Sequence, residues 1–390
     1  MKKNIYLIMA LCIFFACGPK SERVEKIMED GVEIVINHLE PYRLKDEPST
    51  LNLEKVLSID TEDDAVAAQG LTDIYHFDVD ARGNIYILRH PIGPGELVFK
   101  FSGEGNLMTS FARLGQGPFE VEYPNGILLV DSDRIWILED PKRKIYVFDL
   151  DGKGIVEKRL GIKYSDIALL KSGTYLVMQL KSEDMKAKYW PIIISLYDSE
   201  FQKIKELDRF EKYWNRLIAT TLQEKIVCGT ELKFLGRPKD EQIYIGNSER
   251  GYEILVFDLE GQLLRKIRKE YSPVPVSQDY KEKYVKDFES FMPEYAKKIY
   301  FPEHWHPFRS FFLDDEGRLY VMTYEPGENP GENMFDIFNK DGVFISRISL
   351  DVYHWSWGEM NARAKGDRLY VVQEKESGYK ELVVYRMNWE

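Results

Sequence analysis

Short apolar runs separated by polar turns repeat along most of this 390-residue chain. The clearest copy lies between Arg113 and Leu160, and its apolar runs are too short for helices. Asp151-Gly152 inside it favours a tight hairpin, because glycine reaches positive φ without steric cost. The expected strands of this copy are Ile127–Val130, Ile135–Leu138, Ile145–Leu150 and Ile155–Leu160.

Weaker copies of the same unit lie on both sides of this stretch. Four antiparallel strands in about forty residues, with turns at fixed places, are typical of a propeller blade. The sequence therefore predicts an all-β fold, a six-bladed β-propeller of four-stranded antiparallel blades. The other five units are expected at Phe77–Phe111, Ile167–Leu207, Leu232–Ile267, Phe311–Ile348 and Met360–Tyr385.

The sixth unit supplies only three strands before the chain ends, which would leave an open sheet edge. Two early strands, Val32–Ile36 and Leu51–Ile59, precede the first complete unit, and the second is better placed to close the ring beside Leu382–Tyr385. Two short helical insertions are also expected. They are Tyr213–Lys225 and Ser277–Phe301, the latter with apolar residues at helical spacing.

The loop before the central unit contains the run Gly115-Gln116-Gly117-Pro118-Phe119-Glu120, followed by Pro124 and Gly126. This run resembles the start of an NHL-type propeller repeat. It is similar to the Gly-x-Gly-Pro-x-Glu run of the six-bladed β-propeller lipoproteins of Gram-negative bacteria. The resemblance implies the propeller fold, but it implies no single activity, because functions in that family are varied or unknown.

The first residues predict export. Lys2-Lys3 precedes an apolar run at Ile5–Phe15, which is too short to span a bilayer as a stable helix, and Ala16-Cys17-Gly18 follows. This arrangement resembles a lipoprotein signal peptide, which implies that Cys17 is lipidated and anchors the protein to the outer membrane, on the periplasmic side or the surface. Ordinary secretion with cleavage near Ala16 is the alternative. We expect a signal peptide and lipobox at residues 1–17, a tether at 18–31 and the propeller at 32–390.

Composition narrows the possible partners. The formal net charge is −12 and the 53 Lys and Arg residues form no basic stripe, so nucleic acid is not an expected partner. Of the three cysteines, Cys12 would leave with the signal peptide and Cys17 would carry lipid. Cys228 then has no partner for an intramolecular disulfide. Composition leaves the oligomeric state open.

In a four-stranded blade, the loop that leads to the next blade lies on the same face as the loop between the second and third strands. Arg113–Asn125 and Glu270–Arg309 are loops of the first kind, so we expect them on one face, which is the default binding site. The bends at Arg89–Glu96, Glu139–Lys144 and Tyr324–Asn333 should join them. The ligand-binding candidates are Arg113, Gln116, Glu120, His304, Trp305, His306 and Arg309.

Structural roles compete with binding at each of these positions. Arg113 and Glu120 could pair across a tight crossing shaped by Pro118, and Trp305 could be buried between its loop and the disc. His304 and His306 lack a carboxylate at a recognisable ligand spacing, so no metal and no cofactor are expected. The Asp-x-x-Gly turns lack the carboxylate series of a calcium loop.

The sequence thus predicts a lipid-anchored cell-envelope propeller that binds a protein, peptide or glycan. The alternative is a propeller enzyme of the lactonase, lyase or glycan-active kind that uses the central channel. Three or more carboxylates or histidines converging on that channel would favour the enzyme.

Overall fold

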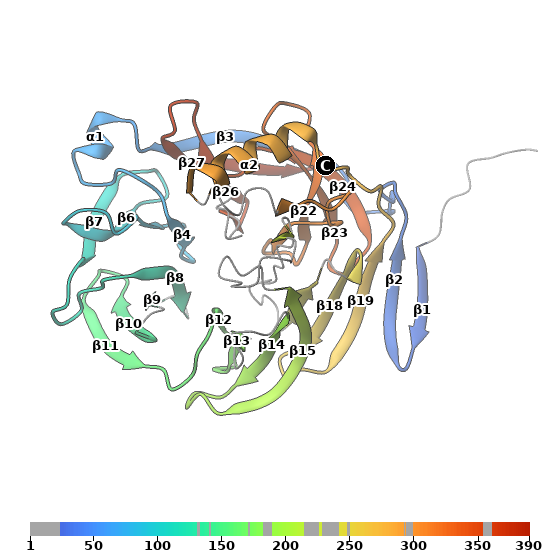
Figure 1. The fold of residues 1–390 in the computed structure, drawn as a ribbon, viewed down its shortest axis with the longest axis horizontal. Coiled ribbons are helices and arrows are strands. Elements are labelled where there is room, and N and C mark those ends of the chain that lie inside the picture. Colours follow the sequence, from blue (N-terminus) through green and yellow to red (C-terminus); the bar gives the residue numbers. More distant parts are fainter. Residues whose placement is uncertain are drawn as a thin grey trace, which may run out of the picture.

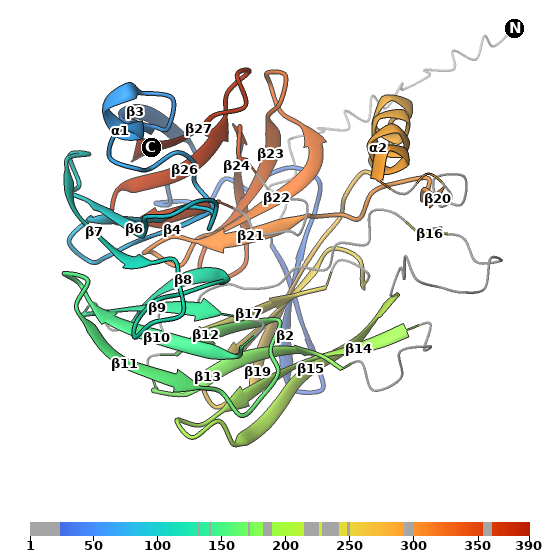
Figure 2. The same cartoon turned by 60° about the vertical axis from the view of Figure 1, so that its left-hand side comes forward.

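A computed structural model describes residues 24–130, 133–139, 142–170, 172–181, 189–213, 226–227, 242–247, 250–291, 293, 299–353 and 361–390. Within these residues the strands form sheets arranged in a ring around a central axis (Figure 1). The chain is a six-bladed β-propeller, as the repeat predicts. The view in Figure 2 shows the neighbouring sheets stacked side by side.

Blades one to three are consecutive antiparallel four-stranded sheets. Blade one contains β4 (His76–Val79), β5 (Ile85–Leu88), β6 (Glu96–Phe101) and β7 (Leu107–Arg113). Blade two contains β8 (Pro124–Val130), β9 (Arg134–Glu139), β10 (Lys144–Asp149) and β11 (Gly154–Arg159). Blade three contains β12 (Asp166–Leu169), β13 (Tyr175–Leu180), β14 (Tyr189–Tyr197) and β15 (Lys203–Tyr213).

Blades four and six include strands from the beginning of the chain, and blade five lies between them. Blade four contains β17 (Gln242–Gly246), β18 (Glu253–Asp258) and β19 (Leu263–Lys269), extended by β2 (Val32–Asn37) and β1 (Glu25–Glu29). Blade five contains β21 (Ser310–Leu313), β22 (Leu319–Pro326), β23 (Asn333–Phe338) and β24 (Phe344–Leu350). Blade six contains β25 (Ala362–Lys365), β26 (Arg368–Glu374), β27 (Lys380–Trp389) and β3 (Leu51–Asp60).

Three smaller elements complete the described chain. Helix α1 (Asp64–Ala67) follows β3, and α2 (Gln278–Phe291) lies between blades four and five. A short parallel pair joins β16 (Ile226–Val227) to β20 (Ile299–Tyr300). No helix among the described residues has both the length and the apolar character needed to cross a bilayer.

The ring closes as the sequence predicts. Strand β3 pairs antiparallel with β27, and Ile59 lies opposite Leu382 in this register. The pairing supplies the outer strand that blade six lacks, so the edge of β27 is covered. Figure 1 shows β3 lying along the outside of β27.

The first strands of the chain take a position that the sequence did not indicate. Strand β2 pairs parallel with β19 at the rim of blade four, and β1 folds back antiparallel on β2. Residues 25–29, expected in the tether, are therefore part of a sheet. The segment that follows crosses blade five, where the Tyr42 amide donates to the Phe344 carbonyl over 2.8 Å and the Asn37 side-chain amide donates to Gly342.

Aspartates fold back on the chain at the tight turns. The Asp80 carboxylate accepts the amides of Arg82 and Asn84, and also the Tyr86 hydroxyl at 3.2 Å. Asp314 repeats this arrangement in blade five with Tyr320 at 3.0 Å. These are Asx turns, in which the side chain replaces backbone partners. Hairpin chemistry thus accounts for the aspartates, as expected.

A buried charge network joins blades four and five. The Lys269 ammonium lies 3.3 Å from Asp336, and their side chains are 2% and 1% exposed. The other Asp336 oxygen accepts from Arg347 at 2.8 Å, and the Tyr252 hydroxyl also donates to Asp336 at 2.8 Å. Burial lowers the pKa of Lys269, while the Asp336 carboxylate acts in the opposite direction. Such a group stays buried only when it has close partners.

Several local expectations can be compared with this fold. The expected helix at Ser277–Phe301 is confirmed as α2, which covers the shorter range Gln278–Phe291. The expected helix at Tyr213–Lys225 is wrong at its first residue, because Tyr213 ends the long strand β15, and its remainder lies outside the described residues. The inner strand expected at Leu232–Leu235 also lies outside them. The short helix α1 has no counterpart among the predictions.

Candidate functional site

The loops between blades and the bends between second and third strands meet on one face of the disc, which we call the loop face. The Arg113 guanidinium, at the end of β7, lies 2.8 Å from Glu96 at the start of β6. The Lys142 ammonium, in the bend of blade two, lies 2.6 Å from Glu122 in the loop that enters that blade. These contacts confirm the predicted proximity of the two kinds of loop in blades one and two.

The predicted polar group at Arg113, Gln116 and Glu120 is occupied by contacts within these loops. Arg113 pairs with Glu96, not with Glu120 as one reading of the sequence had it, and the hydrogen bond with Glu96 raises the pKa of Arg113. The Glu120 carboxylate accepts the Gly117 amide at 2.8 Å, which shapes the turn. The pKa of Glu122 is lowered mainly by its hydrogen bond with Lys142. A hydrogen bond between the Gln116 side chain and the Glu122 carboxylate lowers it further.

The predicted aromatic group at His304–Arg309 connects α2 to the disc. The Trp305 ring stacks on Tyr324 with centroids 4.7 Å apart and an interplanar angle of 1°. The Tyr280 ring of α2 meets the edge of Trp305 at 4.8 Å. Trp305 is half-buried, and its backbone amide donates to the Val274 carbonyl at 2.8 Å. Its geometry therefore matches the structural alternative, a residue held between loop and disc.

The neighbours of Trp305 are positioned by the same loop. His304 forms an isolated backbone bridge with Pro275, and the backbone amide of Arg309 donates to Met322 at 2.8 Å. The Arg309 guanidinium carbon lies 5.7 Å from the centre of the Tyr324 ring. His306 is half-buried in this segment. The contacts described for this group stay near blade five and α2, while those of Arg113 stay in blades one and two. No described contact joins the two groups.

A polar pocket of about 360 Å³ opens on the loop face between blades six and one. Three loops form it: the connection from β3 to β4, the connection from β24 to β25, and the bend from β26 to β27. Its lining residues are Thr72, Asp73, Tyr353, Glu374, Ser377, Gly378, Tyr379 and Lys380. None of these residues was a candidate from the sequence, although their loops are of the kinds that the sequence assigned to the binding face.

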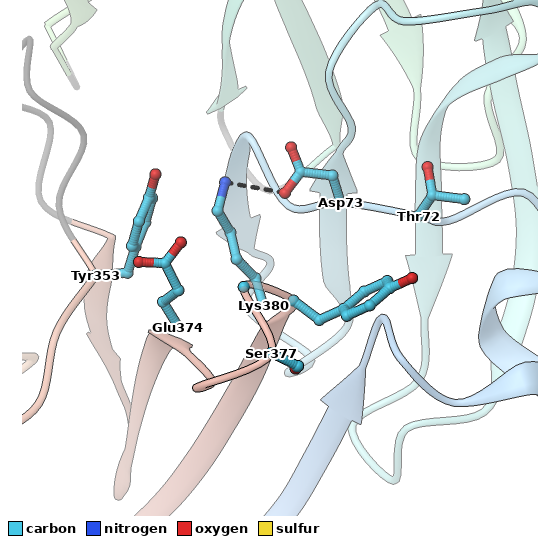
Figure 3. A pocket seen from close by; sticks show the side chains of 8 residues that line it. Thr72, Asp73, Tyr353, Glu374, Ser377 and Lys380 are labelled. Atoms are coloured by element: carbon cyan, nitrogen blue, oxygen red, sulfur yellow. Dashed lines mark ion pairs between the residues drawn. The ribbon is translucent and has the colours of Figure 1, made fainter. Parts of the chain in front are cut away.

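Lys380 organises the pocket. Its side chain is 6% exposed, and its ammonium lies 2.9 Å from Asp73 and 3.2 Å from the Ile74 carbonyl. The ammonium also lies 4.4 Å from the centre of the Tyr353 ring, a cation–π contact. Figure 3 shows the Lys380 side chain rising between Glu374 and Asp73, with Tyr353 on the Glu374 side. The start of β27 is thus fixed to the loop that precedes β4.

Carboxylates dominate the electrostatics of the pocket. The other Asp73 oxygen lies 3.6 Å from His90. Burial lowers the pKa of His90, the Asp73 charge opposes this, and Lys380 lowers it further, so the net shift is downward and the imidazole is mainly neutral at pH 7. Burial raises the pKa of Tyr353, and the charges of Glu374 and Asp73 raise it further. The lining therefore carries two carboxylates and one ammonium, and that ammonium is already paired with Asp73.

The inner strands contain polar residues as well. His76 of β4 is buried, and its Nε2 lies 3.3 Å from the Arg363 guanidinium of β25. Asp78 is buried on the same strand, and one of its oxygens accepts the Val79 amide. In the part of the chain that the structure describes, no three His, Cys, Asp or Glu side chains are grouped so as to hold a metal ion. His304 and His306 are among the described residues and belong to no such group.

Sequence reasoning missed the pocket because its members are separated along the chain. Asp73 and Lys380 are more than 300 residues apart and meet only because β3 closes the ring beside β27. One signal was present: Glu374–Lys380 is the bend between the second and third strands of the sixth unit. That bend could have been added to the loops assigned to the binding face.

Comparisons with known proteins agree with the architecture. Residues 49–227 match the family DUF5128, described as a 6-bladed beta-propeller. No curated protein sequence matches the chain. A Bacteroides fragilis protein named as a proposed exported protein has a similar fold. Its TM-score is 0.51 and its identity 12%, over 91% of this chain and 99% of that one.

Two further solved structures are similar. A member of the duf4221 family from Bacteroides vulgatus has a TM-score of 0.51 and 11% identity over 88% of this chain and 99% of its own. Virginiamycin B lyase from Staphylococcus aureus has a TM-score of 0.39 and 10% identity over 86% of this chain and 99% of its own. The fold and the match over residues 49–227 together identify this chain as a six-bladed β-propeller.

Proposed function

We propose that this protein is a lipid-anchored propeller of the cell envelope that binds a peptide or glycan in the pocket between blades six and one. The observation that carries the proposal is the pocket itself, about 360 Å³ in volume and lined by carboxylates, hydroxyls and two tyrosines. Tyrosine rings offer flat apolar surfaces with a polar tip, and carboxylates accept hydrogen bonds from hydroxyl and amino groups. A single sugar ring or amino-acid side chain fits this volume.

The position of the pocket supports binding. It lies on the loop face, where segments of blades five, six and one converge on a rigid disc. Loops held by a rigid scaffold are common places for recognition. A contribution from the seven residues expected from the sequence stays a prediction, and their described contacts favour roles in shaping the same face.

A blocking substitution tests the proposal. Ser377→Trp would place a large ring in the pocket mouth, and Ser172→Trp is its control in an exposed turn that joins the first two strands of blade three. Both variants and the native protein would be applied to arrays of glycans and peptides. We expect Ser377→Trp to lose the native binding and Ser172→Trp to keep it. Native binding that survives Ser377→Trp would place the ligand elsewhere and refute the proposal.

The envelope location rests on the sequence of residues 1–17, which lie outside the described residues. Replacing Cys17 with Ser should release the protein from membranes and abolish labelling by a fatty-acid probe, because a multiply acylated cysteine is what holds such an anchor stably. Cys228→Ser is the matched control. Unchanged membrane association of Cys17→Ser would contradict the anchoring proposal.

A further inference from the structure

The charges in the pocket between blades six and one point to a particular class of ligand. Glu374 is exposed, lines the pocket and forms no ion pair within the described residues. Asp73, the second lining carboxylate, has one oxygen on Lys380 and the other beside a largely neutral His90. The negative charge of Glu374 is therefore not offset inside the pocket.

The charge of Glu374 raises the pKa values of neighbouring acidic groups. Burial raises the pKa of Asp351, which lies just before Tyr353 in the chain, and the charges of Glu332, Glu374 and Glu381 raise it further. The pKa of Tyr353 responds in the same direction to Glu374 and Asp73. Like charges close together disfavour ionisation, and a cation placed among them relieves that repulsion. The pocket is thus suited electrostatically to a positive group.

The aromatic lining suits the same chemistry. Lys380 already shows how an ammonium sits against Tyr353, with its nitrogen 4.4 Å from the ring centre. Tyr379 lines the pocket with 46% of its surface exposed. The face of a tyrosine ring attracts an ammonium group electrostatically. The hydroxyls of Thr72 and Ser377 add hydrogen-bonding groups for the polar body that would carry it.

We propose that this pocket binds a primary ammonium group on a small polar body, with Glu374 as its charge partner and the tyrosines of the lining, Tyr353 and Tyr379, as its aromatic neighbours. This inference rests on the proposed function, since it names the chemistry of the ligand held by the same pocket. Two sources share that chemistry: a lysine side chain of a peptide and the free amine of an amino sugar.

Four probes separate these possibilities by calorimetry at low salt. They are tetralysine with an acetylated N-terminus and an amidated C-terminus, the fully Nε-acetylated form of this peptide, a glucosamine tetramer and an N-acetylglucosamine tetramer. Acetylation removes the charge while it keeps the chain or the sugar ring. We expect one or both amine probes to bind and their acetylated partners to bind at least tenfold more weakly. Binding of tetralysine alone assigns a peptide source, and binding of the glucosamine tetramer alone assigns a sugar.

Substitutions then locate the charge. Glu374→Gln should weaken the affinity for the amine probe about fivefold. This is the effect expected when an ammonium loses a carboxylate partner about 4 Å away in a water-exposed site. Glu376→Gln, two residues away on the same bend and outside the lining, should leave affinity unchanged. Raising the salt concentration should reduce the difference between native protein and Glu374→Gln. Equal melting temperatures exclude loss of the fold as the cause.

The possible failures are distinct. Equal binding of amine and acetylated probes, lost in Ser377→Trp, would overturn the ammonium inference and leave the proposed binding function intact. Equal effects of Glu374→Gln and Glu376→Gln would also overturn it, because the affinity would then follow net charge and not the pocket. No binding of any probe would count against both.

Discussion

The buried charge network between blades four and five predicts a large and specific loss of stability. Asp336→Asn keeps the shape of the side chain and can still accept the Tyr252 hydroxyl, but it removes the charge that faces Lys269 and Arg347. Arg347 retains Glu325 at 2.7 Å, so the main consequence falls on Lys269, whose side chain is 2% exposed. Leaving a buried charge without its partner costs about 3–5 kcal/mol.

Urea unfolding followed by tryptophan fluorescence measures this cost. A domain of typical stability has about 5–15 kcal/mol available, so Asp336→Asn should unfold at a much lower urea concentration. Lys269→Met should cost less, because Asp336 then keeps Arg347 and Tyr252. The double variant Lys269→Met/Asp336→Asn should be more stable than Asp336→Asn alone, since no ammonium is left unpaired.

The comparison of single and double variants makes the reasoning refutable. If Asp336→Asn loses less than about 1 kcal/mol, the pair does not carry the stability assigned to it. If the double variant loses the sum of the two single losses, Lys269 and Asp336 act independently, and the electrostatic explanation fails.

Three other expectations follow from the described contacts. Trp305→Ala should speed proteolysis within α2, because the ring that joins this helix to the disc is lost; unchanged cleavage would contradict that role. Gly152→Ala should lower the melting temperature more than Gly173→Ala, since both have positive φ but only the first would push a Cβ within 2.4 Å of a phenylalanine ring. Burial raises the pKa of Asp60, but hydrogen bonds led by Lys375 outweigh it and lower that pKa. The Asp60 contribution to stability should therefore be present at neutral pH and be lost progressively as the pH falls below about 4, through the lowered pKa of Asp60. Asp60→Asn should reduce the difference in urea midpoint between neutral and strongly acidic pH.

The repeat was predictable because each blade is specified locally. The apolar runs, the Asp-x-x-Gly turns and the glycine at Gly152 act within one unit, so strand positions and hairpins follow from short stretches of sequence. Closure by Leu51–Ile59 was predictable for a different reason, namely that the sixth unit was one strand short. The parallel pairing of β2 with β19 depends on tertiary packing, and no local pattern indicates it.

The candidate site divides in the same way. The kinds of loop that share a face could be deduced from strand order, and the contacts of Arg113 and Lys142 agree with that deduction. The particular side chains could not, because Asp73 and Lys380 are brought together by ring closure and not by spacing. Trp305 contacts Tyr280 of α2 and Tyr324 of blade five, which gives it a packing role. The sequence alone could not show these tertiary contacts.

The parallel pairing of β2 with β19 also determines the face of the disc at which the described chain begins. Strand β19 runs toward the loop face, so β2 does too, and the antiparallel β1 begins at that face, where Glu25 lies opposite Ile36. Six residues lie between Cys17 and Val24, and the seven steps from one Cα atom to the other span about 25 Å at most when fully extended. A lipid on Cys17 would therefore hold the start of β1, at the rim of blade four, within a short distance of the bilayer, while the pocket between blades six and one lies across the ring from this attachment.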